Sequence, residues 1–381
     1  MNQLNHNQTK QDYTLRTALI NEVYQHLKNK QELDNQTLLK LGKKNSTASW
    51  FELYEAMEIA SILNTISLLR QNPSRREVIK FLTEQEELLP NPDVRESKQL
   101  QLQQFSTPLP YAFCAYLLAG VTDKDVFLEP SAGNGALALF PVFRAKETYL
   151  NEIDSQRLAN LDYIYRDEPI SQHNAENIDD FLDSKIRPNV IILNPPFTSS
   201  LAQGKTNKTV EFHLYSAAKR LAKGGRLVLI SQESFHPQAS SREKFFEKLN
   251  PLLKLEVSFR VPADLYKKRG TTFPTRLSLF RKTTYSIQPE EYRPATIEEL
   301  YKQVLAHLRK AKQQQVLHLP QAEIKQESLF SLDSVFIEAQ PSEITTEPKA
   351  ADTNQATKIT SASASKITWN NPLRINYNYK I

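Results

Sequence analysis

Short apolar runs alternate with amphipathic stretches between residues 99 and 285, and this alternation limits the possible folds more than any other feature. Six runs have the length and composition of buried strands: Val126–Leu128, Thr148–Leu150, Val190–Leu193, Leu227–Ile230, Leu255–Phe259 and Leu277–Phe280. Several of the stretches between them have helical apolar spacing. Strands that alternate with helices build a mostly parallel sheet, so the sequence predicts an α/β domain over residues 99–285.

Residues 1–98 differ in composition, being rich in Gln, Asn, Leu, Glu and Lys. Apolar residues recur there with a helical period in three segments: Leu15–Leu27, Trp50–Leu69 and Val78–Leu89. We therefore expect a helical N-terminal region.

Residues 286–381 form a third region, which begins with an expected helix at Ile297–Gln314. The stretch Gln340–Lys366 is rich in Pro, Ser, Thr, Ala and Glu, and it is predicted to be a disordered linker in a partly disordered C-terminal tail. Residues 367–381 regain aromatic side chains, which indicates a short docking segment or the stump of a further domain.

Composition excludes several classes of protein. The longest nearly unbroken apolar run, Pro110–Val121, is too short to cross a bilayer, and Met1–Tyr13 has no signal-peptide apolar core, so a cytoplasmic protein without membrane contact is expected. A single cysteine, Cys114, excludes an intramolecular disulfide framework, and it is expected to be a core residue. The seven histidines show no metal-ligand spacing, so no metal is expected.

Positive charge is concentrated in one segment. The chain has a net charge of +5, but residues 201–282 hold 17 Lys and Arg against 6 Asp and Glu. Such a segment is either a solvated surface or a wall that faces the phosphates of a nucleic acid, and charge alone does not decide between them.

Glycine is scarce, and its placement predicts a ligand-binding loop. Four of the eight glycines form two pairs beside apolar runs. The first pair lies in the loop that follows Val126–Leu128, before an expected apolar helix start: Glu129, Pro130, Ser131, Ala132, Gly133, Asn134 and Gly135. Ligands bind where such turns follow the strands of an open α/β sheet.

An acid about 20 residues beyond the glycines strengthens this interpretation. Glu152, followed by Ile153, comes just after the apolar run Thr148–Leu150. An acid at this place can hold a ribose hydroxyl, so a nucleoside-bearing cofactor is predicted; the alternative is a surface acid. Ala138 is acceptable as the third position of a dinucleotide fingerprint, so the loop alone leaves a dinucleotide open.

The run Val190–Leu193 ends in a second motif, Asn194, Pro195, Pro196 and Phe197. Two prolines fix the backbone and remove two donors, which leaves backbone carbonyls and the Asn194 amide oxygen free to accept hydrogen bonds. An ordinary strand-terminating turn would have the same sequence. The upstream glycine loop favours a functional role instead.

Taken together, these motifs resemble those of the amino-methyltransferases that use S-adenosylmethionine, and within them the γ-type N6-adenine DNA methyltransferases. Glu129–Gly135 resembles their cofactor loop and Asn194–Phe197 their catalytic tetrapeptide. Upstream, Phe105, Ser106, Thr107 and Pro108 look like the family's Phe-x-Thr-Pro motif, which closes over the methionine end of the cofactor. The resemblance covers residues 99–285 and implies a Rossmann-like methyltransferase fold with helices on both faces of the sheet.

The resemblance also implies individual roles. Glu152 is similar to the ribose-binding acid, with Ile153 beside it. Asn174 and Ala175 occupy the place of the residues that contact the cofactor's adenine, although the family more often has Asp at the first of these. The implied cofactor is S-adenosylmethionine, the implied partner is DNA, and the implied setting is DNA methylation of the restriction-modification kind.

Elementary chemistry agrees with this assignment. The exocyclic amine of adenine is a poor nucleophile, and the Asn194 oxygen and the Pro195 carbonyl can accept its hydrogens while Phe197 stacks on a flipped base. Related tetrapeptides occur in enzymes that methylate protein glutamine or RNA bases, and an inactive nucleic-acid-binding module is a third alternative. Some similarity to methyltransferase domains that accompany strawberry-notch-like helicases suggests a helicase partner for the C-terminal tail.

Overall fold

A computed structural model describes residues 16–45, 49–90, 106–197, 208–264 and 274–317 of the chain. The chain divides at residue 311, and the fold below is that of residues 1–311 with the end of the helix that crosses this point. Phe105, the predicted linker 340–366 and the terminal segment 367–381 lie outside the described residues.

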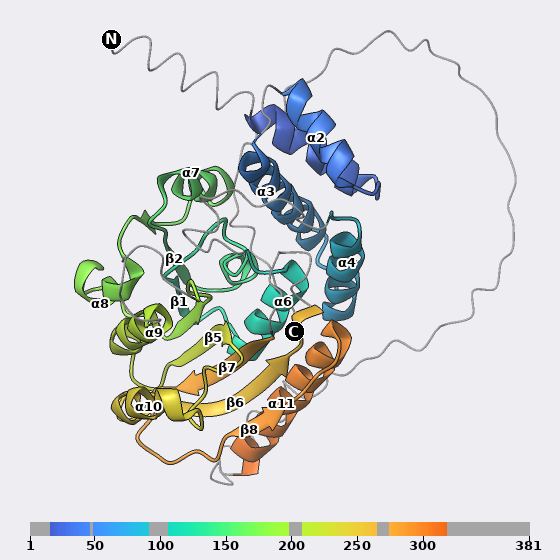
Figure 1. The fold of residues 1–381 in the computed structure, drawn as a ribbon. Coiled ribbons are helices and arrows are strands. Elements are labelled where there is room, and N and C mark those ends of the chain that lie inside the picture. The colour runs from blue at the N-terminus through green and yellow to red at the C-terminus, as the bar shows by residue number, and fades with distance from the viewer. Residues whose placement is uncertain (1–15, 46–48, 91–105, 198–207, 265–273, 318–381) are drawn as a thin grey trace, which may run out of the picture. The chain divides into compact units, whose positions relative to one another are not determined.

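An eight-stranded sheet forms the centre of the fold (Figure 1). Its strands are β1 (Val126–Glu129), β2 (Glu147–Asn151), β3 (Ile170–Ser171), β4 (Val190–Leu193), β5 (Arg226–Gln232), β6 (Lys254–Val261), β7 (Thr275–Arg281) and β8 (Glu290–Tyr292). They lie in the order β3-β2-β1-β4-β5-β7-β6-β8, and only β7 runs antiparallel to its neighbours. The predicted mostly parallel α/β sheet is therefore confirmed, and all six expected strands are present.

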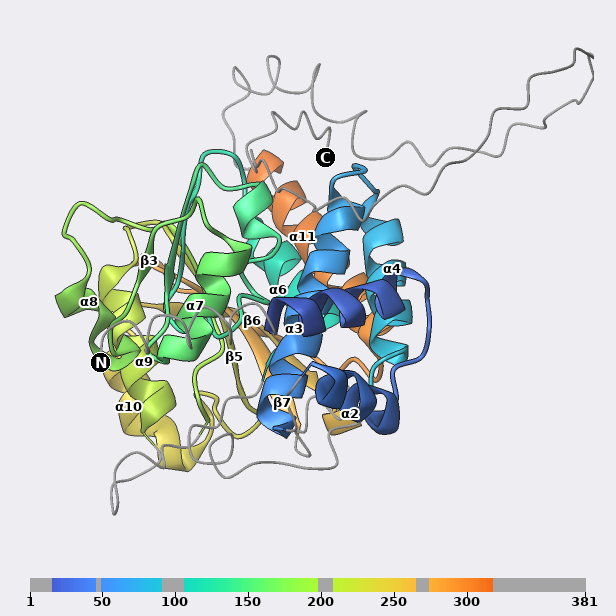
Figure 2. The ribbon, with the colours of Figure 1, turned by 90° about the horizontal axis from the view of Figure 1, so that it is seen from above.

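Helices cover both faces of this sheet. The helices of the sheet domain are α6 (Leu109–Ala119), α7 (Ser155–Ile164), α8 (Ile178–Phe181), α9 (Thr209–Arg220), α10 (Glu243–Leu249) and α11 (Ile297–Leu317). Figures 1 and 2 show α8, α9 and α10 on one side and α6 and α11 on the other. α6 is apolar on all sides and is buried against β4, β5 and β7, with Cys114 fully buried within it, as expected.

The N-terminal region is helical, as predicted. Residues 16–28 form a helix, followed by α2 (Asn35–Lys44), α3 (Trp50–Leu69) and α4 (Arg75–Glu87). Serines begin two of them: the Ser49 hydroxyl caps α3, and Ser74 with Glu77 forms a capping box on α4. α3 is buried on most of its surface and contacts α7, while α4 contacts α6.

The expected helix immediately after the glycine loop is wrong. Residues 133–140 form consecutive turns, and a short 3₁₀ helix, η1 (Pro141–Phe143), follows. Gly135 has φ +83°, outside the helical region, and Pro141 has no N–H to bond back to the turn before it. These two residues disfavour an α-helix here although residues 137–140 between them are apolar and buried.

The strand order creates a crevice beside β1. From β1 the chain moves outward through β2 to β3, then crosses to the opposite side of β1 to form β4. Such a reversal separates the loops at the carboxyl ends of the two central strands, and ligands of open α/β sheets bind there. Both sequence motifs, the loop after β1 and the tetrapeptide after β4, flank this point.

No helix in the described part of the chain is long and apolar enough to cross a membrane.

Candidate cofactor and catalytic site

The glycine loop after β1 depends on backbone conformations that favour glycine. Gly133 has φ +55° and Gly135 φ +83°. A Cβ at Gly135 would overlap ring atom Cε2 of Tyr165, whose hydroxyl donates a 2.6 Å hydrogen bond to the Gly135 carbonyl. Glycine is therefore needed in this turn, which packs closely against α7 and against Tyr165 just after it.

Glu129, the last residue of β1, is a buried carboxyl with one oxygen unused. Its side chain is 1% exposed, and Oε2 has no hydrogen-bond partner. Burial, together with the nearby charge of Glu152, raises the pKa of Glu129 well above its ordinary value. An unsatisfied buried oxygen at the crevice suits a polar group of a bound ligand.

Glu152 lies against the same loop from the end of β2. Its Oε2 accepts a hydrogen bond from the Gly133 N–H at 2.7 Å, and its Oε1 accepts one from Asp154 N at 2.8 Å. Burial raises the pKa of this carboxyl. The next residue, Ile153, is 55% exposed, an apolar side chain beside the predicted ribose acid.

Asn151 joins two of the predicted cofactor segments, a role that the sequence analysis missed. Its Nδ2 donates to the carbonyls of Pro130 and His173, both at 2.9 Å, and its Oδ1 accepts from His173 N. The loop after β1 is thereby tied to the segment after β3. There Asn174 accepts a 2.9 Å bond from Glu176 N, and Ala175 is buried.

The tetrapeptide after β4 contacts the predicted Phe-x-Thr-Pro motif. Asn194 Nδ2 donates a 2.9 Å hydrogen bond to the hydroxyl oxygen of Thr107, and Pro108 is the N-cap of α6. Pro195 is buried and Pro196 is partly exposed. Two sequence motifs 87 residues apart therefore meet at one hydrogen bond.

Phe197 is 4% exposed and belongs to the hydrophobic core. Its carbonyl accepts a 3.2 Å bond from Gln232 Nε2 at the end of β5. The expected stacking of this ring on a target base stays a prediction.

A buried histidine supports the loop from α9. His213 Nδ1 lies 3.1 Å from the Ser131 hydroxyl. Burial lowers the pKa of His213 to about 4, so the ring is neutral at physiological pH.

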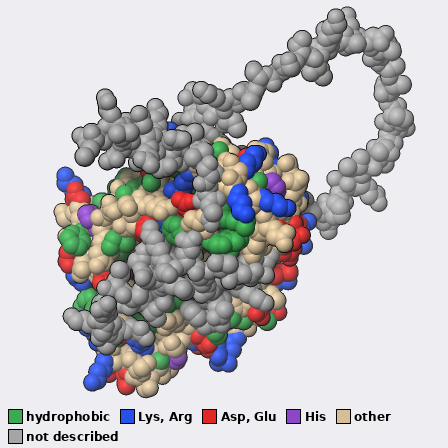
Figure 3. Space-filling model, turned by 45° about the horizontal axis from the view of Figure 1, so that its top comes forward, with side chains coloured by type: hydrophobic (Ala, Val, Ile, Leu, Met, Phe, Trp, Pro, Cys, Tyr) green, Lys and Arg blue, Asp and Glu red, His purple; other side chains and the backbone are tan. Residues whose placement is uncertain are grey.

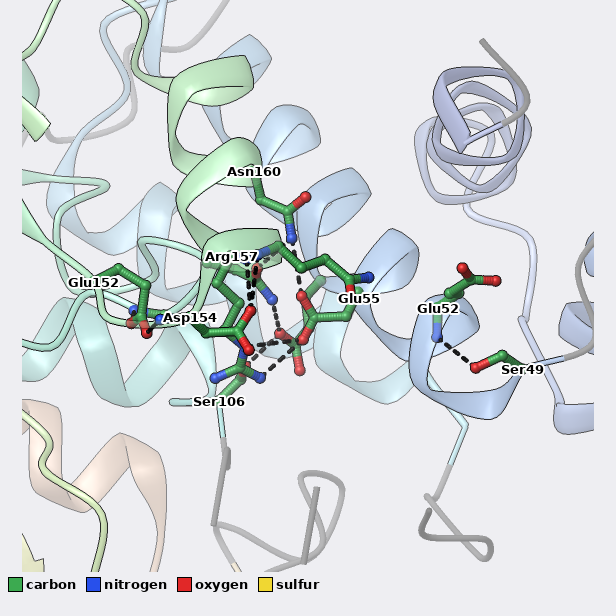
Figure 4. A network of polar contacts seen from close by, with 12 residues as sticks. Ser49, Glu52, Glu55, Ser106, Glu152, Asp154, Arg157 and Asn160 are labelled. Atoms are coloured by element: carbon green, nitrogen blue, oxygen red, sulfur yellow. Dashed lines mark hydrogen bonds and ion pairs between the residues drawn. The ribbon is translucent and has the colours of Figure 1, made fainter. Parts of the chain in front are cut away.

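The helical N-terminal region also reaches the loop (Figure 4). The carboxylate of Glu55 in α3 accepts hydrogen bonds from Arg157 Nε and Nη2 at 3.1 and 2.8 Å. It also accepts one from Asn160 Nδ2 at 2.9 Å. Asn160 in turn donates to Asn134 Oδ1 at 2.7 Å, and Asn134 donates to Glu58 Oε2 at 2.5 Å. This cluster links α3 through α7 to the glycine loop. Sequence patterns gave no sign of it, because acids on a helix resemble a solvated face.

Several cations of the basic segment point inward. Arg220 donates to four backbone carbonyls between residues 179 and 186, Arg226 pairs with Asp125 at 2.6 Å, and Arg276 pairs with Glu291 at 2.9 Å. The side chains of Arg220 and Arg276 are 3% and 5% exposed. Figure 3 shows positive and negative side chains interspersed on the face in view. These three cations of the segment are therefore engaged inside the protein and do not add to its surface charge.

Comparison with known proteins gives one family match. Residues 117–260 match the family model described as Methyltransferase small domain. No curated protein matches the chain.

Several solved structures are similar. A modification subunit of a putative type I restriction enzyme from Vibrio vulnificus YJ016 aligns at 15% identity over 61% of this chain and 58% of its own, with a TM-score of 0.45. TrmN from Thermus thermophilus aligns at 20% identity over 45% of this chain and 48% of its own, with a TM-score of 0.35. A putative class I S-adenosylmethionine-dependent methyltransferase from Listeria monocytogenes aligns at 13% identity over 78% and 97%, with a TM-score of 0.46.

The chain thus spans less than two thirds of the length of the Vibrio and Thermus proteins. The family match covers the chain from β1 through β5. It therefore includes the glycine loop after β1 and the tetrapeptide after β4. The family match and the strand order of the sheet together give residues 117–260 the Rossmann-like fold of a methyltransferase domain.

Proposed function

We propose that the chain transfers a methyl group from S-adenosylmethionine to the exocyclic N6 amine of adenine in DNA. The observation that carries this proposal is the hydrogen bond from Asn194 Nδ2 to Thr107, beside the glycine loop on the neighbouring strand β1. It holds the amide plane of Asn194, so that Oδ1 is the atom left to accept a hydrogen from a target amine.

The residues of the crevice fit the cofactor. Glu129 Oε2 is an unsatisfied buried oxygen, and Glu152 holds its carboxylate at the end of β2, where a ribose would lie. Gly133 has φ +55°, and a Cβ there would lie 3.4 Å from Arg157 Nη1. Glu129 to Gly135, Glu152, Ile153, Asn174 and Ala175 would hold S-adenosylmethionine, whose activated sulfonium methyl is the group transferred.

The chain's own contribution is orientation and charge stabilisation. As the target nitrogen attacks, positive charge grows on it, and the Asn194 oxygen and the Pro195 carbonyl accept its hydrogens. The tetrapeptide keeps these acceptors in place because its prolines fix the backbone at the end of β4. Bound S-adenosylmethionine would supply the methyl group, with its sulfur as the leaving group, and the amine proton released from N6 would pass to solvent.

The substrate is tested by offering labelled S-adenosylmethionine with DNA, RNA and total protein in parallel. We expect label in DNA, recovered as N6-methyladenine after hydrolysis to nucleosides. Poly(dA·dT) should be labelled and poly(dG·dC) should not, since only adenine offers the N6 amine. Label in RNA or on glutamine side chains instead would replace the substrate in this proposal. No transfer to any of them, with the cofactor bound, would indicate a binding module.

A further inference from the structure

α3 brings a partly buried carboxylate, Glu58, to the glycine loop of the proposed cofactor site. Its Oε2 accepts hydrogen bonds from Asn134 Nδ2 at 2.5 Å and from the Ser106 hydroxyl. Asn134 lies between the two glycines of the loop, and Ser106 precedes Thr107 in the Phe-x-Thr-Pro motif. Glu58 therefore stands where the loop, that motif and the N-terminal region converge.

The surroundings of Glu58 carry excess negative charge. The Arg157 guanidinium interacts electrostatically with three carboxylates, those of Glu55, Glu58 and Glu152. Arg16 interacts electrostatically with Glu55 as well. Arg157 directs its Nε and Nη2 to Glu55 rather than to Glu58. Across the described residues no cation forms an ion pair with Glu58, so its charge is balanced only at longer range.

A second observation points to a ligand at the glycine loop. Glu129 Oε2 is fully buried without a hydrogen-bond partner, and Glu129 interacts with Glu152 across the loop. The methionine end of S-adenosylmethionine carries a primary ammonium, a three-donor cation that carboxylates bind through short charge-assisted hydrogen bonds.

We infer that Glu58 binds the α-ammonium group of the cofactor, so that the N-terminal helical region supplies one wall of the cofactor site. This inference rests on the cofactor site proposed above. Glu58 Oε2 is held by Asn134 and Ser106, and Oε1 is the atom that receives the ammonium. The helical region then belongs to the binding site itself.

Calorimetry with three ligands tests this role on the full chain. S-adenosylhomocysteine carries the ammonium, its deaminated analogue has hydrogen in place of that group, and 5′-methylthioadenosine lacks the whole amino-acid part. Glu58→Gln keeps the shape and removes the charge. Glu52→Gln is the matched control, because Glu52 lies on the same helix but away from the cluster, near Ser49 (Figure 4).

In Glu58→Gln we expect the affinity for S-adenosylhomocysteine to fall tenfold or more, as loss of a charge-assisted hydrogen bond predicts. The affinities for the deaminated analogue and for 5′-methylthioadenosine should stay within about twofold. Glu52→Gln should bind all three ligands like the parent. An equal loss for all three ligands, or no loss, would overturn the inference.

The parent protein gives an independent answer should Glu58→Gln fail to fold. It should bind the deaminated analogue at least tenfold more weakly than S-adenosylhomocysteine, and equal binding would overturn the inference. A crystal structure with S-adenosylhomocysteine should place the ammonium nitrogen about 2.7–2.9 Å from Glu58 Oε1. If the parent binds neither S-adenosylhomocysteine nor 5′-methylthioadenosine, the proposed cofactor site itself is rejected.

Discussion

The side-chain amide of Asn194 is held by Thr107, whose hydroxyl oxygen accepts a 2.9 Å hydrogen bond from Nδ2. A proposed catalytic group just after β4 is therefore oriented by a residue that precedes α6. The orientation leaves Oδ1 as the acceptor for a target amine.

Thr107→Val should release this amide. We expect kcat for methyl transfer to fall about tenfold, the size of one lost hydrogen bond that leaves a donor unpaired. Thr107→Ser, which restores the hydroxyl, should recover most of the rate. Steady-state kinetics of the three proteins decide the matter, and a parent rate in Thr107→Val would show that Asn194 needs no such support.

Asn194→Ala should separate catalysis from binding. Losing an acceptor that acts mainly in the transition state should lower methyl transfer by a factor on the order of a hundred or more, with cofactor affinity nearly unchanged. Single-turnover rates and calorimetry give the two quantities. Transfer at the parent rate would make the Asn-Pro-Pro-Phe turn structural.

Phe197 calls for a milder substitution than alanine. Because its side chain is 4% exposed, Phe197→Ala would also lower stability, by about 3–5 kcal/mol for a large-to-small core change. Phe197→Leu retains more of the volume and removes the aromatic face. If the ring stacks on the base, Phe197→Leu should weaken DNA binding and turnover more than it lowers the unfolding midpoint.

Gly135→Ala should be much more harmful than the same change at another left-handed glycine. Gly135 (φ +83°) and Gly224 (φ +76°) both favour glycine, but only Gly135 would place a Cβ against Tyr165, whereas nothing lies within 4 Å of the Cβ position at Gly224. Gly224→Ala should cost about 1–2 kcal/mol of unfolding free energy from strain alone, and Gly135→Ala clearly more. Urea titrations of both variants measure the difference. Equal losses of unfolding free energy in the two variants would mean that Tyr165 can move to make room for the added Cβ at little energetic cost.

Arg157→Met should leave the Glu55 carboxylate buried without its main partner. The two side chains are 6% and 1% exposed, so we expect a loss of about 3–5 kcal/mol in unfolding free energy. Lys219→Met, which breaks a more exposed pair with Asp179, is the control and should change stability by at most about 1 kcal/mol. A small loss in Arg157→Met would show that Glu55 takes up a proton instead.

His213 should make stability depend on pH. The folded protein keeps this ring neutral to about pH 4, whereas in the unfolded chain it binds a proton near its ordinary pKa of 6.5. Its contribution is complete above about pH 6.5 and is lost as the pH falls toward 4, by at most about 3 kcal/mol. The free energy of unfolding of His213→Asn should therefore fall less than that of the parent across this interval. If the free energies of unfolding of the two proteins change equally with pH, a group other than His213 takes up the proton.

Sequence patterns predicted the sheet because its strands are apolar runs buried on both faces, such as Val190–Leu193. The glycine loop could be found because glycine is rare in this chain. β3 was missed because it spans two partly exposed residues, Ile170 and Ser171, and so has no apolar signature.

Long-range polar contacts were beyond the sequence analysis. Glu55 meets Arg157 across 102 positions and Glu58 meets Asn134 across 76, and no local period marks such pairs. For the same reason, sequence patterns did not reveal that some cations of residues 201–282 have internal partners. Arg226 pairs with Asp125, 101 positions away.

The place of β7 between β5 and β6 has a consequence for synthesis on the ribosome. β5 ends at Gln232, but its partner β7 begins only at Thr275, so the edge of β5 has no strand to pair with while the intervening residues emerge. At about 5–20 residues per second this interval lasts roughly a few seconds. An apolar edge, Leu227–Ile230, is open during that time, and we expect the nascent chain to be most prone to aggregate, and most in need of a chaperone, at this stage.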